Sequence, residues 1–248
     1  MKKYNVDIYT IFATIGIMTA MVSCSRDSCP ITAGSISSET RTLPSFTNIV
    51  LYDKINLVLT QDTVQTVSIS GDKNLMAGIQ TDVSDSTLTI RDRNGCNWLR
   101  SPGYEISVFV SENLLRYVTY YGAGNISSTN TLYAPQFTVD SWSGTGAVNI
   151  RVNSQDLTAI VRNANASIKV SGSAYNAFIY CADAGSVDLS GLPSTNVSID
   201  QKSVRDSYVN VSGTLQASVV YRGNVYYEGS PTSVDSLITS SGRLIHLQ

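Results

Sequence analysis

The sequence predicts an all-β fold: a parallel β-helix, or β-solenoid, of about 20 residues per coil, with an N-terminal β region that caps or continues it. Two observations predict this fold. Apolar residues recur in steps of twenty through the C-terminal half, and a turn containing glycine or asparagine follows most of them. The first positions of these repeats are Tyr117, Phe137, Leu157, Ala177, Val197, Ala217 and Leu237.

Each repeat is too short to bury an apolar face alone, so a continuous core requires neighbouring coils to stack. Within a repeat, short runs of alternating side chains predict strands with one face inward. An antiparallel sandwich also has short strands at regular spacing. However, a sandwich has no reason to keep the same spacing through all the repeats from Tyr117 to Leu237, so the sequence favours the solenoid.

The chain begins with a predicted export signal. Residues 1–23 combine a polar start containing Lys2 and Lys3 with an apolar run that is too short to span a bilayer comfortably. This run ends in Ser23 followed by Cys24, which resembles a bacterial lipobox. The resemblance implies cleavage before Cys24 and lipidation of this cysteine, and acyl chains there would anchor the protein to a membrane. The alternative is an ordinary signal peptide with a chance cysteine.

The remaining residues divide by composition. Residues 24–45 are polar and rich in serine, and we expect a flexible tether. Residues 46–113 contain strands without a strict repeat and form the predicted N-terminal β region, in which Asn74 to Met76 could hold one helical turn. Residues 114–248 contain the solenoid repeats, and residues 46–248 are expected to fold as one domain.

Three cysteines remain after Cys24, so at most one disulfide can form among them. Cys29 and Cys96 lie outside the repeats and could pair with each other. Cys181 shares the spacing of Ile179 and is expected to point into the core. A nucleophilic cysteine lacks a partner, because the only histidine is His246 near the C-terminus.

Composition and motifs exclude several functions. The chain has 17 basic and 19 acidic residues, which gives no electrostatic footprint for nucleic acid. One histidine and no Cys-x-x-Cys motif argue against zinc, and we expect neither a metal nor a cofactor. Some β-helices act on polysaccharides, which requires two carboxylates within about 5–10 Å. Asp140 and Asp200 share a predicted column but are three coils, roughly 14 Å, apart, so we expect no catalytic residues.

Aromatic and basic residues gather on one predicted outer face. Trp142 would lie one coil from Arg162, close enough to stack, with Tyr120 and Tyr180 on a neighbouring outward column. These four residues form the candidate contact site, which could bind a glycan, a peptide or a second copy of the chain. The alternative is that the rings only cover strand edges and turns.

Several segments resemble a bacterial family of auto-transporter adhesins, the head GIN domain, over about residue 42 to the end. The segments are Phe46-Thr-Asn-Ile-Val, Ile55-Asn-Leu-Val-Leu, Val67-Ser-Ile-Ser-Gly-Asp-Lys-Asn-Leu, Ser86-Thr-Leu-Thr-Ile, Tyr121-Gly-Ala-Gly-Asn-Ile, Ser143-Gly-Thr-Gly-Ala-Val and Tyr227-Glu-Gly-Ser-Pro. The third repeat departs from the pattern, with Asn163-Ala-Asn165 where glycine would be usual.

The resemblance implies a β-helical lipoprotein or exported protein of a Gram-negative cell envelope, anchored at the outer membrane, with an adhesin-like role. We therefore expect a non-catalytic binding module whose partners are the membrane, through its lipid, and a glycan, a host or envelope protein, or itself. A polysaccharide-acting β-helix enzyme is the first alternative, and two carboxylates on adjacent coils in a groove would favour it. A purely structural envelope component is the second.

Overall fold

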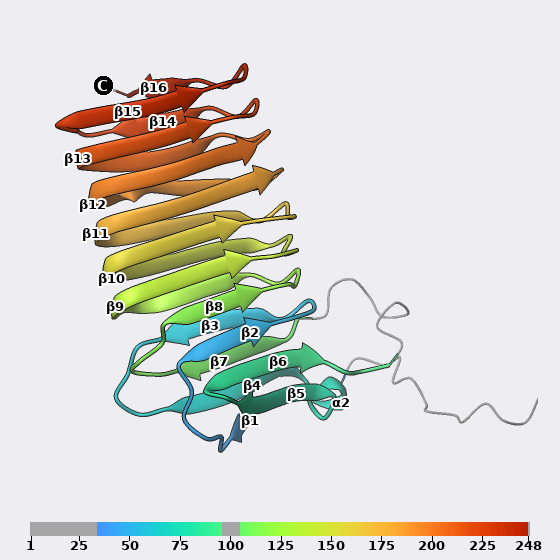
Figure 1. Cartoon of the computed structure of the whole chain (residues 1–248). Helices are drawn as coiled ribbons and strands as arrows, with labels where there is room; N and C mark the ends of the chain where they lie inside the picture. Colours follow the sequence, from blue (N-terminus) through green and yellow to red (C-terminus); the bar gives the residue numbers. More distant parts are fainter. Residues whose placement is uncertain (1–33, 96–104, 248) are drawn as a thin grey trace, which may run out of the picture.

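The chain folds into a parallel β-solenoid of about six turns with about 20 residues per coil. The structure is a computed structural model that describes residues 34–95 and 105–247. Coils stack along one axis, and each coil crosses two opposed layers of strands (Figure 1). The parallel solenoid expected from the repeat is therefore confirmed, and the antiparallel sandwich is excluded.

Long strands in the repeats account for the two layers of the solenoid. The N-terminal elements are β1 (Ile36–Arg41), β2 (Asn48–Leu51), β3 (Asn56–Thr60), β4 (Thr66–Asp72), α2 (Lys73–Met76), β5 (Ile79–Ser84), β6 (Thr87–Asp92) and β7 (Ser107–Ser111). The repeats contain β8 (Tyr117–Tyr120), β9 (Ile126–Ser141), β10 (Ala147–Val161), β11 (Ser167–Asp183), β12 (Ser186–Ser203), β13 (Ser207–Val219), β14 (Val225–Glu228), β15 (Ser233–Ile238) and β16 (Leu244–His246). The long strands bend at a corner, so that each contributes one part to either layer.

We call these layers the first and the second sheet. The first sheet contains β5, β6, β2, β8, the C-terminal parts of β9 to β13, and β15. The second sheet contains β1, β4, β7, β3, the N-terminal parts of β9 to β13, β14 and β16. Alternate side chains of both sheets point between them, and the buried residues form one hydrophobic cluster along the axis.

The pairing inside the repeats follows the twenty-residue step where the apolar pattern is strongest. Phe137 pairs with Leu157, and Leu157 with Ala177, in parallel register. All three are buried. At the ends of the repeat array the step changes: Tyr117 pairs with Thr138, and Gln201 with Val219. These changes of one or two residues shift which side chains point outward.

One consequence concerns Leu237 at the C-terminal end. The spacing predicts an inward position, but the shifted register pairs Leu237 with Ser218 on the outer face, and its side chain is exposed. In the described part of the chain no strand pairs with the outer edge of β15, and every residue of β15 is exposed. The C-terminal end of the solenoid is therefore open.

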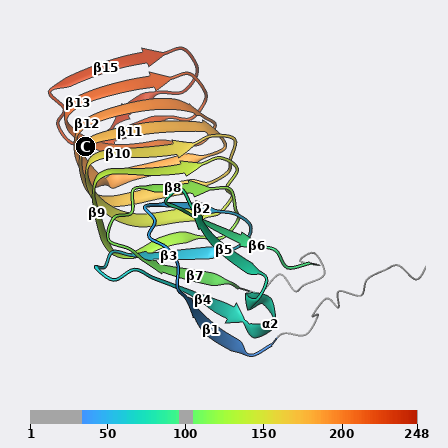
Figure 2. The same cartoon turned by 60° about the horizontal axis from the view of Figure 1, so that its bottom comes forward.

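The N-terminal region both continues and caps the solenoid. Strands β2 and β3 form a coil that lies between the coil of β6 and β7 and the coil that begins with β8 (Figure 2). The order of the coils in space thus differs from their order in the sequence. Beyond this point the pairing becomes antiparallel, since β4 pairs with β7, β1 with β4, and β5 with β6.

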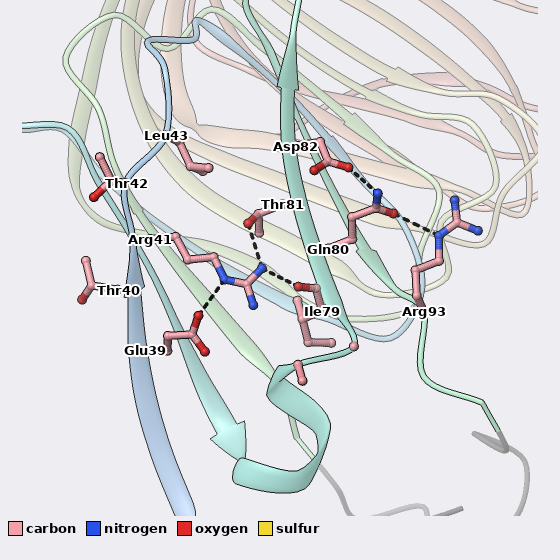
Figure 3. Close-up of a pocket in the computed structure, with 12 residues that line it drawn as sticks. Glu39, Thr40, Arg41, Thr42, Leu43, Ile79, Gln80, Thr81, Asp82 and Arg93 are labelled. Atoms are coloured by element: carbon pink, nitrogen blue, oxygen red, sulfur yellow. Dashed lines mark hydrogen bonds and ion pairs between the residues drawn. The ribbon is translucent and has the colours of Figure 1, made fainter. Parts of the chain in front are cut away.

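A hollow of about 810 Å³ lies between β1 and β5 at the capped end. Figure 3 shows Arg41 of β1 reaching across it, where its guanidinium donates hydrogen bonds to the hydroxyl of Thr81 at 3.0 Å and to the carbonyl oxygen of Ile79. The same group donates to the carbonyl oxygen of Met76 at 3.1 Å. These bonds hold β1 against β5 and α2, so we assign this hollow a structural role.

The tether expectation is wrong for residues 36–41, which form β1 and pair with β4. Among the described residues only β4 pairs with β1, and most side chains of β1 are exposed, so the sequence has no apolar alternation there. The export signal of residues 1–23, Cys24, Cys29 and Cys96 lie outside the described residues. Among the described residues, no helix has the length and apolar character needed to cross a membrane.

Candidate functional site

Five side chains stack along the edge of the first sheet, where its strands enter the turns. The rings of Tyr52 and Tyr121 lie 4.9 Å apart with an interplanar angle of 6°. Tyr121 and Trp142 follow at 6.4 Å and 21°. The Arg91 guanidinium lies 3.6 Å from the Tyr52 ring centroid, and that of Arg162 lies 4.4 Å from the Trp142 ring. We call these five residues the aromatic ladder.

The expected placement of Tyr120 in this site is wrong. Because Tyr117 pairs with Thr138, Tyr120 falls in register with Ser141 on the inward column and is 0% exposed. Its hydroxyl donates to the carbonyl oxygen of Gly124 and accepts the backbone N–H of Gly146 at 3.0 Å. Tyr121 takes the outward place instead.

Glycines allow the turns below the aromatic ladder to approach each other closely. A Cβ at Gly124 would lie 1.9 Å from the carbonyl oxygen of Ile55, and one at Gly146 would lie 2.0 Å from that of Gly124. Any larger residue would push the coils apart at these positions. The close contact of the turns helps to hold the rings above them at stacking distance.

A buried carboxylate fixes the end of the aromatic ladder. Asp140 is 1% exposed, and its two oxygens accept hydrogen bonds from Arg162 at 3.0 and 3.1 Å. The hydroxyl of Tyr117 donates a third bond to Asp140 at 3.0 Å. This two-bond contact with a planar guanidinium orients Arg162 over Trp142, and the bond to Asp140 raises the pKa of Arg162 further.

Burial, together with the negative charge of Asp140, raises the pKa of Tyr117 to about 12. An acid whose pKa is higher in the folded state stabilises the fold below its unfolded pKa, here 10.0, and this contribution is lost as pH rises through about 12. Between these pH values we expect the free energy of unfolding to fall less in the Tyr117→Phe variant than in the wild type. The difference should be on the order of 1 kcal/mol. Urea unfolding at a series of alkaline pH values measures this difference.

Burial also raises the pKa of Tyr120, and this group is present in both proteins, so the difference between them isolates Tyr117. Parallel curves of stability against pH for wild type and Tyr117→Phe would contradict the assignment.

The remaining candidate, Tyr180, lies on the outer face of β11, one coil beyond Ile160 and one before Asp200. The ammonium group of Lys202 lies 4.9 Å from the Tyr180 ring centroid and 3.7 Å from Asp200. Trp142, Arg162 and Tyr180 thus share one face, as the spacing predicts. Tyr52, Tyr121 and Arg91 are site residues that the sequence analysis missed.

The stacking determines what the aromatic ladder can bind. One face of Trp142 is covered by Tyr121 and the other by Arg162. Trp142 is nevertheless 41% exposed, which leaves the ring edge for an external molecule. The aromatic ladder therefore offers ring edges, phenol hydroxyls and guanidinium groups rather than open ring faces.

A hollow of about 650 Å³ lies beside the aromatic ladder and is lined by Tyr52, Tyr121, Asp53, Lys54 and Asp92, among others. Asp53 has a positive φ of 60°, and its carboxylate accepts the backbone N–H of Asp92 at 2.9 Å. Two carboxylates from adjacent coils thus line one hollow, an arrangement that the spacing within the repeats did not predict.

Among the described residues no group of three or more histidine, cysteine or acidic side chains is placed to hold a metal ion. Cys181 is buried in the core, as its spacing predicts, and burial raises its pKa to about 11. Its thiol therefore stays protonated at neutral pH, and a protonated thiol is a poor nucleophile.

The chain is a parallel β-solenoid whose outer face carries a stacked row of aromatic and basic side chains, and this fold defines its class as a β-helical protein. The chain belongs to the family "Putative auto-transporter adhesin, head GIN domain", whose model matches residues 45–231. The resemblance of the sequence segments to this family is thereby confirmed.

Solved structures show the same fold. A putative adhesin from Bacteroides fragilis is 21% identical, with 86% of this chain and 97% of that chain covered and a TM-score of 0.80. A putative adhesin from Parabacteroides distasonis is 18% identical, with 86% and 98% covered and a TM-score of 0.67. A putative lipid binding protein from the same species is 16% identical, with 87% and 98% covered and a TM-score of 0.63. No curated protein matches the chain.

Proposed function

We propose that the protein is a non-catalytic, adhesin-like binding module of the cell envelope, and that it contacts its partner through the outer face of the first sheet. The aromatic ladder carries this proposal, because its ring edges and guanidinium groups lie in a fixed row beside a hollow. A rigid row loses little conformational entropy on binding, which favours affinity. Tyrosine, tryptophan and arginine are also the residues most enriched at binding hot spots.

We further propose that a lipid on Cys24 anchors the module at the outer membrane after removal of residues 1–23. Support comes from the position of Cys24 directly after a short apolar run and from the adhesin family to which the chain belongs. Fractionation of cells that produce Cys24→Ser tests the anchor, since this variant should leave the membrane fraction. A variant that stays in that fraction contradicts it.

Glycan and matrix-protein arrays probed with the purified chain test the binding role. The Trp142→Ala variant should weaken binding to any positive probe by about tenfold or more, which corresponds to about 1.4 kcal/mol. The matched control is Tyr133→Ala, an exposed aromatic residue of β9 that lies outside the aromatic ladder. A wild-type chain that binds no probe, or equal binding by Trp142→Ala, contradicts the proposal.

Asp53 and Asp92 give one observation that favours the polysaccharide-acting alternative, because they lie on adjacent coils and line the same hollow. A glycosidase requires two such carboxylates. The hydrogen bond from the backbone of Asp92 to Asp53 instead favours a role for Asp53 in holding the turn. Incubating the same polysaccharides with the wild type and with Asp92→Asn decides: release of reducing ends by the wild type alone would establish the enzyme.

A further inference from the structure

A second hollow, of about 440 Å³, lies farther along the first sheet and contains no member of the aromatic ladder. Nine residues of β10 to β13 line it. Six of these carry polar side chains: Asp156, Asn176, Asn196, Ser198, Thr214 and Gln216. The exposed apolar member is Phe178, because Ala177 and Val197 are buried in the core. The hollow thus combines one aromatic ring with a polar surround.

The register explains why a hollow forms here. Phe178, Ser198 and Gln216 occupy successive outward positions of one column, in parallel register. Successive coils lie about 4.8 Å apart, so Phe178 and Gln216 are separated by about 9.6 Å along the axis. The small side chain of Ser198 leaves the space between them open. The space extends one coil from Ser198 toward Phe178 and one coil toward Gln216. One six-membered ring resting on Phe178 would fill it.

Phe178 differs from the rings of the aromatic ladder in having an open face. Its side chain is 62% exposed. Within residues 34–95 and 105–247, no aromatic ring or cationic group stacks on it, in contrast to Trp142, which is covered on both faces. Phe178 can therefore accept a ligand ring in a way that Trp142 cannot.

A row of hydrogen-bonded polar groups forms the wall of the hollow. The amide of Asn176 donates to Asp156 at 2.8 Å, and that of Asn196 donates to Asn176 at 3.0 Å. The backbone N–H of Thr214 continues the row, with its bond to Asn196 at 3.4 Å. These bonds fix the orientation of every amide in the row. In this row Asp156 accepts a hydrogen bond through only one carboxylate oxygen, so the other oxygen can accept one from a ligand hydroxyl. The Gln216 amide is exposed at the rim of the hollow.

The chemistry of the lining selects the ligand. None of the nine residues is basic and one, Asp156, is acidic, so phosphate, sulfate and carboxylate groups are disfavoured. An acyl chain would need a continuous apolar lining, whereas polar side chains surround Phe178. A neutral sugar ring matches both features, because it has an apolar C–H face for the phenyl ring and hydroxyl groups for amides and a carboxylate.

We propose that this hollow is a binding subsite for one neutral sugar residue of a glycan. The sugar rests on Phe178 above Ser198, and its hydroxyl groups bond to Asp156, Asn196 and Gln216. This subsite rests on the binding role proposed above and specifies the ligand class. Its lining residues are distinct from those of the aromatic ladder.

Saturation-transfer difference NMR tests the subsite with the purified chain and neutral trisaccharides of glucose, mannose and N-acetylglucosamine at millimolar concentration. We expect a signal from at least one trisaccharide. Phe178→Ala should weaken the apparent affinity for that trisaccharide at least tenfold. Ser198→Phe should also abolish the signal, because the added ring fills the space while all other lining residues remain. Phe178 is exposed and Ser198 is half-buried, and both lie in one outward column, so neither substitution changes a core residue.

Two controls separate this proposal from the first one. Phe109→Ala removes another exposed phenylalanine, which lies in β7 on the second sheet, and should leave the signal unchanged. Tyr133→Ala removes an exposed ring of β9 that lies in neither site, and it should leave the signal unchanged as well. Loss of array binding in Trp142→Ala, with no effect of Phe178→Ala on the NMR signal, would sustain the aromatic ladder and overturn the subsite. The subsite is also overturned if the wild type binds none of the trisaccharides, or if Ser198→Phe binds them as well as the wild type.

Discussion

Replacement of Tyr120 by alanine is expected to destabilise the solenoid by about 3–5 kcal/mol, the range found for large buried aromatic residues. Tyr120 is 0% exposed and lies among the largest fully buried side chains of the chain. Its loss would leave a cavity between the two sheets and remove the hydrogen bonds that join two turns. Chemical denaturation followed by circular dichroism measures the free energy of unfolding.

The neighbouring residue supplies the matched control for this prediction. Tyr121→Ala removes the same side chain from the outer face, where it stacks on Tyr52 and Trp142. Such contacts contribute about 0.5–1.5 kcal/mol each, so we expect a loss of about 1–2 kcal/mol. Tyr120→Phe retains the ring and should lose about 1–2 kcal/mol through the missing hydroxyl. A larger loss for Tyr121→Ala than for Tyr120→Ala would refute the register described here.

Replacement of Arg162 by methionine is expected to cost about 2–3 kcal/mol. Removing one partner of a buried ion pair leaves an uncompensated charge, which typically costs about 3–5 kcal/mol. The Asp140 side chain is 2% exposed and that of Arg162 is 35% exposed, so partial access of water lowers our expectation. The same denaturation experiment measures it.

Lys202→Met is the matched control, because Lys202 also contacts an aromatic ring and a carboxylate but lies on the surface. Its pair with Asp200 is 40% and 49% exposed, and exposed pairs contribute at most about 1 kcal/mol. The double variant Asp140→Asn with Arg162→Met removes the buried charge and should recover about 1 kcal/mol relative to Arg162→Met. Equal losses for Arg162→Met and Lys202→Met would show that Asp140 is not held as described.

The sequence predicted the fold where the chain repeats itself most strictly. Between Phe137 and Ala177 each coil contains the same number of residues, so the apolar period equals the coil period and the pairing follows from the spacing. The inward position of Cys181 follows for the same reason. Parallel coils that bury one continuous core produce this pattern directly.

The candidate site was predicted only in part, because the side-chain direction in a strand alternates with each residue. A one-residue change in coil length between Tyr117 and Thr138 therefore turns Tyr120 inward and Tyr121 outward. Nothing in the local sequence marks this change, since both positions carry tyrosine. Trp142 and Arg162 were placed correctly relative to each other because the coil between them keeps the length of the sequence repeat.

The partners of β2 could not be predicted. Leu51 pairs with Ile90 on one side and Tyr120 on the other, at sequence separations that no short repeat encodes. The same applies to Tyr52, which joins the aromatic ladder only because β2 lies beside β8. Contacts of this kind depend on tertiary packing rather than on any local pattern.

This inserted coil also constrains the order in which the molecule can assemble. Strands β2 and β3 leave the ribosome before any of the segments that flank them in space, so neither can complete its hydrogen bonds until synthesis has passed β8 and the start of β9. The later coils, by contrast, add one after another onto a finished edge. Contacts between segments far apart in the sequence form slowly, so we expect the capped end to close more slowly than the later coils stack.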